Sequence, residues 1–171
     1  MSGITRRNFL KSTATGALSS TVTMTTGILA SAKQPVPTTT ILAYEKLRIA
    51  TLDELRVGQP LEFLYPDAAS PCILLKLGKP APGGVGPDGD IVAYSSRCTH
   101  LGCPLRFEQS TLTLKCPCHY SIFDVELGGQ MVVGQATENL PQVTLAFDQT
   151  TGFIHALSVT GLIYGRQSNI L

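Results

Sequence analysis

The sequence lacks a strong net charge, an internal repeat and a periodic apolar segment of helix length. Its 171 residues carry a formal net charge of +1, and only 15% of them are charged. No strong electrostatic field therefore favours nucleic acid or an anionic membrane surface as a partner. The absence of helical periodicity, together with 16 glycines and 11 prolines, argues against a helix bundle and favours a turn-rich, all-β protein.

Short apolar or alternating segments separated by turn residues predict an antiparallel β sandwich or small barrel. The expected strands are PLEFLY (60–65), CILLKL (72–77), IVAYS (91–95), TLTLKC (111–116), SIFDV (121–125), QMVV (130–133), QVTLAF (142–147), GFIHALSV (152–159) and LIYG (162–165). Thr51, followed three residues later by Glu54, predicts one capped helical turn.

The first residues differ from the rest in composition. The basic stretch TRRNFLK (5–11) precedes 21 uncharged residues that end in Ala-Ser-Ala, which is typical of an export signal. The adjacent Arg6 and Arg7, followed by Phe-Leu-Lys, resemble a twin-arginine signal. We therefore expect residues 1–32 to direct export of the folded protein to the periplasm. Residues 33–45, which begin with a Pro/Thr-rich stretch, are expected to form a linker and N-terminal segment.

A retained membrane anchor is the alternative for the uncharged stretch, whose length is near the ~20 residues that a membrane span needs. Ten of its 21 residues are Ser or Thr, which makes a poor span. We therefore expect cleavage after Ala32, and an association with the membrane only if the signal is retained.

Four of the five cysteines and two of the three histidines lie in two short segments, CTHLGC (98–103) and CPCHYS (116–121). Each segment pairs one cysteine with one histidine, as Cys98-x-His100 and as Cys116-x-x-His119. A Cys2His2 zinc site usually pairs its two cysteines within one loop, and two disulfides would leave both histidines without a role. Both segments adjoin predicted strands, so a β scaffold would present them on loops.

The two segments closely resemble the boxes of the Rieske [2Fe–2S] family, in which two cysteines hold one iron and two histidines hold the other. The resemblance makes Cys98 and Cys116 the thiolate ligands. It makes His100 and His119 the imidazole ligands, bound through Nδ1.

The same resemblance implies a Rieske-type β domain over residues 46–171, with a small cluster-binding subdomain made of two loops within residues 97–123. Cys103 and Cys118 would form a disulfide between the two loops, a bond that an exported protein can keep. Neutral imidazoles in place of thiolates raise the reduction potential of such clusters to roughly −150 to +300 mV. This suits electron transfer, and we expect the chain alone to catalyse no reaction.

Two residues at the end of the second box and one just after it are expected to tune the reduction potential. By the resemblance, Ser121 donates a hydrogen bond to a bridging sulfide. Phe123 stands where high-potential members of the family carry a tyrosine whose hydroxyl bonds a ligand sulfur. Tyr120 stands where the bc-complex proteins have glycine. We therefore expect a midpoint potential below that of the bc-complex proteins.

The stretch GGQMVVGQATENLPQVTL (128–145) and the C-terminal GLIYGR (161–166) resemble the small subunit of arsenite oxidase. This implies a molybdopterin-containing large subunit that oxidises arsenite, in a heterodimer or a multiple of it. Electrons would pass through this chain to a soluble cytochrome c or a small, azurin-like copper protein. Gln135, Thr137 and Asn139 are candidates for contact with the large subunit, with ordinary turn residues as the alternative.

Two other functions remain possible at this point. A Rieske subunit of a quinol-oxidising bc-type complex shares the cluster and the disulfide, but it has a firm membrane anchor and a different third loop. A zinc-bound or disulfide-stapled binding module would be colourless, whereas a Rieske protein is reddish-brown.

Two further residues have reactive side chains but are expected to be structural. Cys72 lies in an apolar strand, where a buried, inert thiol is the simplest interpretation. His155 lies in a predicted strand far along the chain from either box.

Replacing Phe123 by Tyr should raise the midpoint potential of the cluster, because the added hydroxyl would stabilise the reduced state by a hydrogen bond. A redox titration of the two proteins followed by electron paramagnetic resonance (EPR) measures the difference. An unchanged potential in the variant would refute the interpretation.

Overall fold

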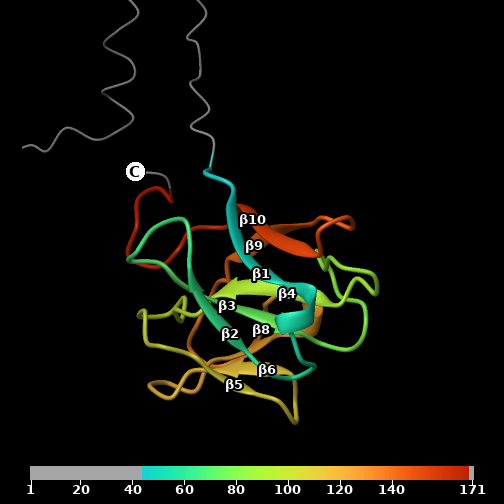
Figure 1. The fold of residues 1–171 in the computed structure, drawn as a ribbon. Coiled ribbons are helices and arrows are strands. Elements are labelled where there is room, and N and C mark those ends of the chain that lie inside the picture. Colours follow the sequence, from blue (N-terminus) through green and yellow to red (C-terminus); the bar gives the residue numbers. More distant parts are fainter. Residues whose placement is uncertain (1–43, 170–171) are drawn as a thin grey trace, which may run out of the picture. The chain divides into compact units, whose positions relative to one another are not determined.

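The computed structural model describes residues 44–169, which form an all-β fold of two antiparallel sheets (Figure 1). The larger sheet has six strands in the order β1-β10-β9-β4-β3-β2, and the smaller sheet has four in the order β5-β6-β7-β8. The expected fold class is thus confirmed. The expected export signal, with Arg6 and Arg7, lies outside the described residues.

The larger sheet comprises β1 (Leu47–Thr51), β2 (Leu61–Leu64), β3 (Pro71–Lys76), β4 (Ile91–Ser95), β9 (Gln142–Phe147) and β10 (Phe153–Thr160). The smaller sheet comprises β5 (Arg106–Glu108), β6 (Thr113–Lys115), β7 (Ile122–Asp124) and β8 (Gln130–Val133). The described helical turns are the short 3-10 helices η1 (Leu52–Glu54) and η2 (Val125–Leu127).

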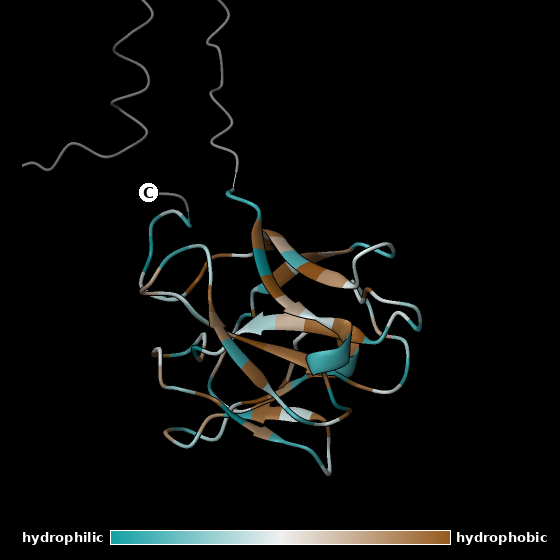
Figure 2. Ribbon diagram, in the orientation of Figure 1, coloured by the Kyte–Doolittle hydropathy of each residue, from teal (hydrophilic) through white to brown (hydrophobic). Residues whose placement is uncertain are grey.

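Strands β3 and β4 separate two hydrophobic cores. Successive side chains of a strand point to opposite faces, so Leu74 and Ala93 belong to one core while Leu75 and Val92 belong to the other. This burial on both faces explains why the two segments are continuously apolar rather than alternating. In Figure 2 hydrophobic residues lie mainly along the strands, and hydrophilic ones in the connecting loops.

The smaller sheet is inserted between two neighbouring strands of the larger sheet. Ala93 of β4 pairs with Val143 of β9, and Tyr94 pairs with Gln142. The chain therefore leaves the larger sheet and returns to it at adjacent positions. Tyr94 also ties the two parts together, because its buried hydroxyl donates to the carbonyl of Val125 at 2.9 Å.

Eight of the nine expected strands form, and the expected helical turn is present as η1. There the amide of Thr51 donates to Glu54 Oε2 at 2.6 Å. The strand expected for LIYG is wrong. Gly161 just before it and Gly165 at its end have φ of 86° and 82°. The amide of Ile163 donates to Asn169 Oδ1 instead of pairing with a strand. Strands β1 and β5 were not anticipated.

Replacing Tyr94 by Phe should lower the free energy of unfolding by about 1–2 kcal/mol, because the Val125 carbonyl would lose its partner in a buried place. Urea denaturation of the cluster-loaded protein measures the change. Tyr44→Phe is the matched control, since the half-buried Tyr44 hydroxyl reaches the Val159 carbonyl at only 3.4 Å. Equal losses in the two variants would contradict the larger contribution expected of the buried Tyr94 bond.

Candidate metal centre

Two loops emerge from the same end of the smaller sheet. The first cluster loop (residues 96–105) precedes β5, and the second cluster loop (residues 116–121) connects β6 to β7. The start of β5 pairs with the end of β6, as Arg106 with Lys115, and Lys115 pairs in turn with Ile122 at the start of β7. Strand register therefore places the two loops side by side.

The two loops are closed by the same hydrogen-bond pattern. The carbonyl of Cys98 accepts from the amide of Gly102 at 2.8 Å, and that of Cys116 accepts from Tyr120 at 3.1 Å. In addition, the amide of each cysteine donates to the carbonyl five residues later, at 2.9 Å in the first loop and 2.8 Å in the second. The backbone of each loop thus fixes the position of its cysteine.

The structure brings together the four residues expected as ligands. Cys98 and Cys116 are buried and not disulfide-bonded. The rings of His100 and His119 lie edge to face, with centroids 4.7 Å apart. His119 is exposed and His100 is half-buried, so this centre lies at the protein surface.

A disulfide joins the two loops, as the resemblance implied. It links Cys103 to Cys118 across 15 positions of the sequence. The Sγ atoms of Cys103, Cys116 and Cys118 lie within 4.8 Å of one another. Because two of these sulfurs are bonded together, the three do not form a metal site, and the bond braces the loops beside the Cys116 ligand position.

The donor set fits a cluster with two thiolate and two imidazole ligands. Nδ1 of His100 is buried and has no hydrogen-bond partner among the described residues. Burying such an atom unpaired costs about 1–3 kcal/mol, which a metal bond would offset. Burial raises the pKa of the Cys98 thiol, and the adjacent Cys116 thiol raises it further. Binding as a thiolate therefore requires the positive charge of the metal.

A third loop (residues 134–141) supports the two cluster loops, and sequence reasoning did not anticipate this role. The buried Ser121 Oγ accepts from the amides of Gln135 at 3.1 Å and Ala136 at 3.0 Å. Both lone pairs of the hydroxyl are thereby used, which leaves its hydrogen for another acceptor. On the other side, Thr99 Oγ1 donates to the carbonyl of Glu138 at 2.8 Å.

The residues expected to tune the potential have different environments. Phe123 is fully buried in β7, opposite Leu114 and Met131. Tyr120 is 78% exposed, and its φ of 59° lies in the left-handed region that favours glycine. A glycine would adopt this backbone conformation without strain.

The three candidates for partner contact are all exposed on the third loop. Their assignment stays a prediction, but Asn139 has a structural use. Its Oδ1 accepts from the amide of Met131 at 3.0 Å, so this side chain shapes the loop.

Cys72 and His155 lie outside the metal centre. Cys72 is buried in β3, and burial raises the pKa of its thiol to about 12, which is consistent with an inert residue. His155 lies in β10 and packs edge-on against Phe153. Burial lowers the pKa of His155, as does the nearby charge of Lys46.

This arrangement defines a metal-binding β domain, in which two surface loops enclose paired sulfur and nitrogen donors. Residues 46–144 match the Rieske [2Fe-2S] domain family, and the chain belongs to that family. The donor geometry alone would also accommodate zinc, so the family match decides in favour of the [2Fe–2S] cluster.

Relatives of known function support the same assignment. The chain is 44% identical over 132 residues to the iodate reductase subunit IdrB of Denitromonas iodatirespirans, which covers 74% of this chain and 69% of that protein. It is 44% identical over 68 residues to the cytochrome bc1 complex Rieske iron-sulfur subunit of Streptomyces lividans, 39% of each chain.

A solved structure is also similar. It is the soluble domain of the Rieske protein II (soxF) from Sulfolobus acidocaldarius, with a TM-score of 0.62 and 28% identity over 68% of this chain and 78% of that one.

Replacing Gly134 by Ala should abolish stable cluster binding. A Cβ there would lie 2.3 Å from Ser121 Cα, so the third loop would move away and take its two amide donors with it. Iron content and visible absorbance of the purified protein measure the loss. Gly152→Ala is the control, because Gly152 also has a positive φ, of 72°, but has nothing within 4 Å of a Cβ. Full iron content in Gly134→Ala would contradict this role of the third loop.

Proposed function

We propose that the chain is the electron-transfer subunit of a periplasmic arsenite oxidase, working with a molybdopterin-containing large subunit. The observation that carries electron transfer is the position of the centre. The sulfur donors are buried on one side, while His119 is exposed on the other. When bound, the [2Fe–2S] cluster accepts and releases one electron at a time.

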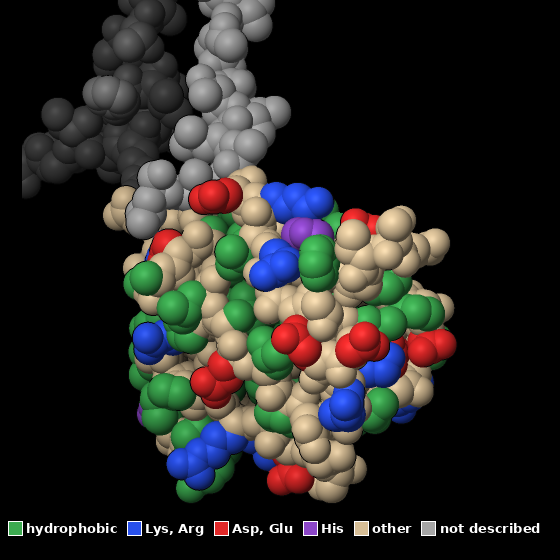
Figure 3. Space-filling view, in the orientation of Figure 1, with side chains coloured by type: hydrophobic (Ala, Val, Ile, Leu, Met, Phe, Trp, Pro, Cys, Tyr) green, Lys and Arg blue, Asp and Glu red, His purple; other side chains and the backbone are tan. Residues whose placement is uncertain are grey.

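Some residues of the chain would bind the cluster, and others would let a partner protein reach it. Cys98, Cys116, His100 and His119 would hold the two irons, and all four are then committed to the cluster. With these four side chains holding the cluster, this chain would supply electron transfer, and the substrate would be transformed on another subunit. Exposed Leu101 and Tyr120 beside the histidines would let a partner approach closely. Acidic and basic side chains are interspersed on the face drawn in Figure 3.

Two observations bear on the identity of the large subunit. The segment 128–145 resembles arsenite oxidase, while the 44%-identical relative is a subunit of iodate reductase. The two reactions move electrons in opposite directions: oxidation of arsenite to arsenate releases two electrons, and reduction of iodate consumes electrons. Iodate reduction is therefore our second candidate function, and the direction of electron flow separates the two.

Periplasmic localisation and a cytochrome c or azurin-like acceptor complete the proposal. Localisation rests on the signal-like residues 1–32. No helix within residues 44–169 has the length and apolarity to cross a membrane.

The test is EPR of the purified, cluster-loaded complex from the source organism. Arsenite added to the oxidised complex should produce the spectrum of the reduced Rieske cluster, because electrons flow from arsenite into the cluster. Dithionite gives the fully reduced reference, and a complex carrying His100→Ala, which loses an iron ligand, is the control without signal.

Each other outcome points to a different reaction. If arsenite has no effect but iodate oxidises the dithionite-reduced cluster, the large subunit reduces iodate. If neither oxyanion changes the spectrum and a quinol produces it, the protein serves a bc-type complex.

A further inference from the structure

The C-terminal segment, residues 161–169, packs against the first cluster loop although it contains no strand. We propose that Tyr164 and Arg166 of this segment are positioning residues for that loop. Tyr164 covers the backbone of the loop that carries Cys98 and His100, and Arg166 holds Tyr164 in place. The proposal depends on the Rieske cluster of this chain and not on the identity of the large subunit.

The segment is closed on itself by Asn169. This buried side chain accepts from the amide of Ile163 at 2.9 Å and donates to the carbonyl of Gly161 at 2.7 Å. Ile163 is itself buried in the core of the larger sheet. The segment therefore has a fixed shape and a fixed attachment to the domain.

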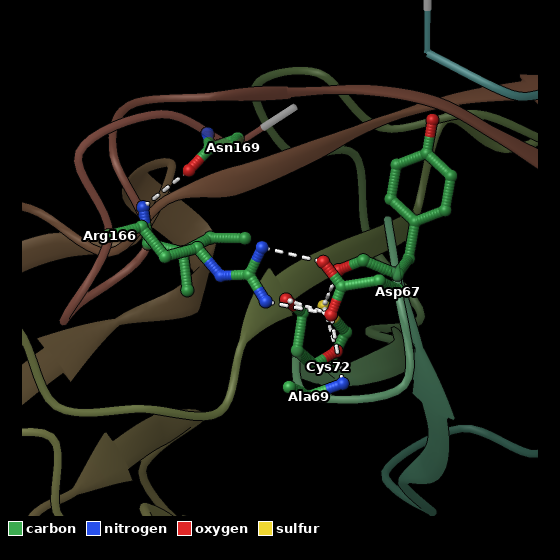
Figure 4. A network of polar contacts seen from close by, with 8 residues as sticks. Asp67, Ala69, Cys72, Arg166 and Asn169 are labelled. Atoms are coloured by element: carbon green, nitrogen blue, oxygen red, sulfur yellow. Dashed lines mark hydrogen bonds and ion pairs between the residues drawn. The ribbon is translucent and has the colours of Figure 1, made fainter. Parts of the chain in front are cut away.

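Arg166 ties the segment to the turn between β2 and β3. Its guanidinium donates twice to the carboxylate of Asp67, at 2.5 and 2.7 Å (Figure 4). The carboxylate also accepts from the amide of Ala69 at 2.8 Å and from the hydroxyl of Ser70 at 3.2 Å. These donors, Arg166 first, hold the pKa of Asp67 below its usual range. A bidentate pair fixes orientation as well as distance.

Between these two attachments, Tyr164 lies against Gly102 of the first cluster loop. A Cβ on Gly102 would lie 2.5 Å from Tyr164 Cδ1 and 2.6 Å from Cε1, so the ring occupies the place of a side chain. Gly102 is buried as a result, whereas Tyr164 itself remains 40% exposed.

Gly102 is the residue that closes the loop around the cluster. Its amide donates to the carbonyl of Cys98, and its carbonyl accepts from Arg97 Nη1 at 3.3 Å. Tyr164 borders two surface hollows, one lined by Arg97 and Leu101 and the other by Thr99 and Leu162. Removing the ring would join the hollows and admit water to the bond between Gly102 and Cys98.

The consequence should be visible at the cluster. A loop that samples several arrangements gives the irons several ligand geometries, which broadens the EPR lines. It also releases the cluster faster, because Cys98 and His100 separate from the irons more often. A loss of stability elsewhere in the domain would lower the free energy of unfolding without broadening the EPR lines of the loaded cluster.

The experiment compares cluster-loaded variants of the full chain. In Tyr164→Ala we expect broadened EPR lines and about tenfold faster loss of visible absorbance in the presence of an iron chelator. Tyr164→Phe should behave like the parent protein, because the ring and not the hydroxyl covers Gly102. Leu162→Ala is the control within the same segment, since its exposed side chain should leave the EPR lines unchanged.

Arg166→Gln tests whether Arg166 acts through Tyr164. Alone, it should broaden the lines and speed cluster loss; combined with Tyr164→Ala, it should add nothing to the effect of the latter. Parent-like EPR lines and cluster loss in Tyr164→Ala would overturn the proposal. Fully additive effects in the double variant would overturn the link between the two residues. Neither result bears on the arsenite experiment, which uses the parent complex.

Discussion

Burial of β3 and β4 on both faces is the constraint on which the rest of the structure depends. Each strand contributes alternate side chains to two cores, so a shift of β4 by one residue would turn Tyr94 toward the other core and break the bond between its hydroxyl and the Val125 carbonyl. The register of β4 also fixes the pairing of Tyr94 with Gln142. At this point the chain leaves the larger sheet to form the smaller one and then returns. The cluster loops thus extend from a base whose position is set by apolar packing.

The metal centre adds a second requirement, because its histidines must be accessible while its loops stay rigid. An exposed loop would ordinarily be mobile. Here restraints come from three directions: the Cys103–Cys118 disulfide across the loops, the third loop through Ser121 and Thr99, and the C-terminal segment through Tyr164. Each of these contacts restrains a loop residue close to a ligand position, and His119 remains exposed to solvent.

The sequence predicted those parts of the fold whose signal is local. Alternation and turn residues located eight strands, and the spacing of cysteines and histidines located both cluster loops. What it missed depends on distant partners. The short strand β5 is held by its pairing with β6. In LIYG, Ile163 packs in the core, and its amide donates to the side chain of Asn169 instead of to a neighbouring strand. The support that the third loop gives to Ser121 joins residues 14 and 15 positions apart, and no short motif announces it.

The same geometry limits where reaction specificity can reside. A site whose four donors are all committed to the cluster sets how readily an electron enters, but it does not select an oxyanion. Partner choice must then lie on the surface around the site, which explains how subunits of iodate reductase and of the cytochrome bc1 complex can resemble the same chain. On the third loop, Asn139 is already engaged with the amide of Met131, whereas the side chains of Gln135 and Thr137 are exposed. Divergence between such systems should therefore concentrate at these two positions rather than in the cysteine and histidine segments.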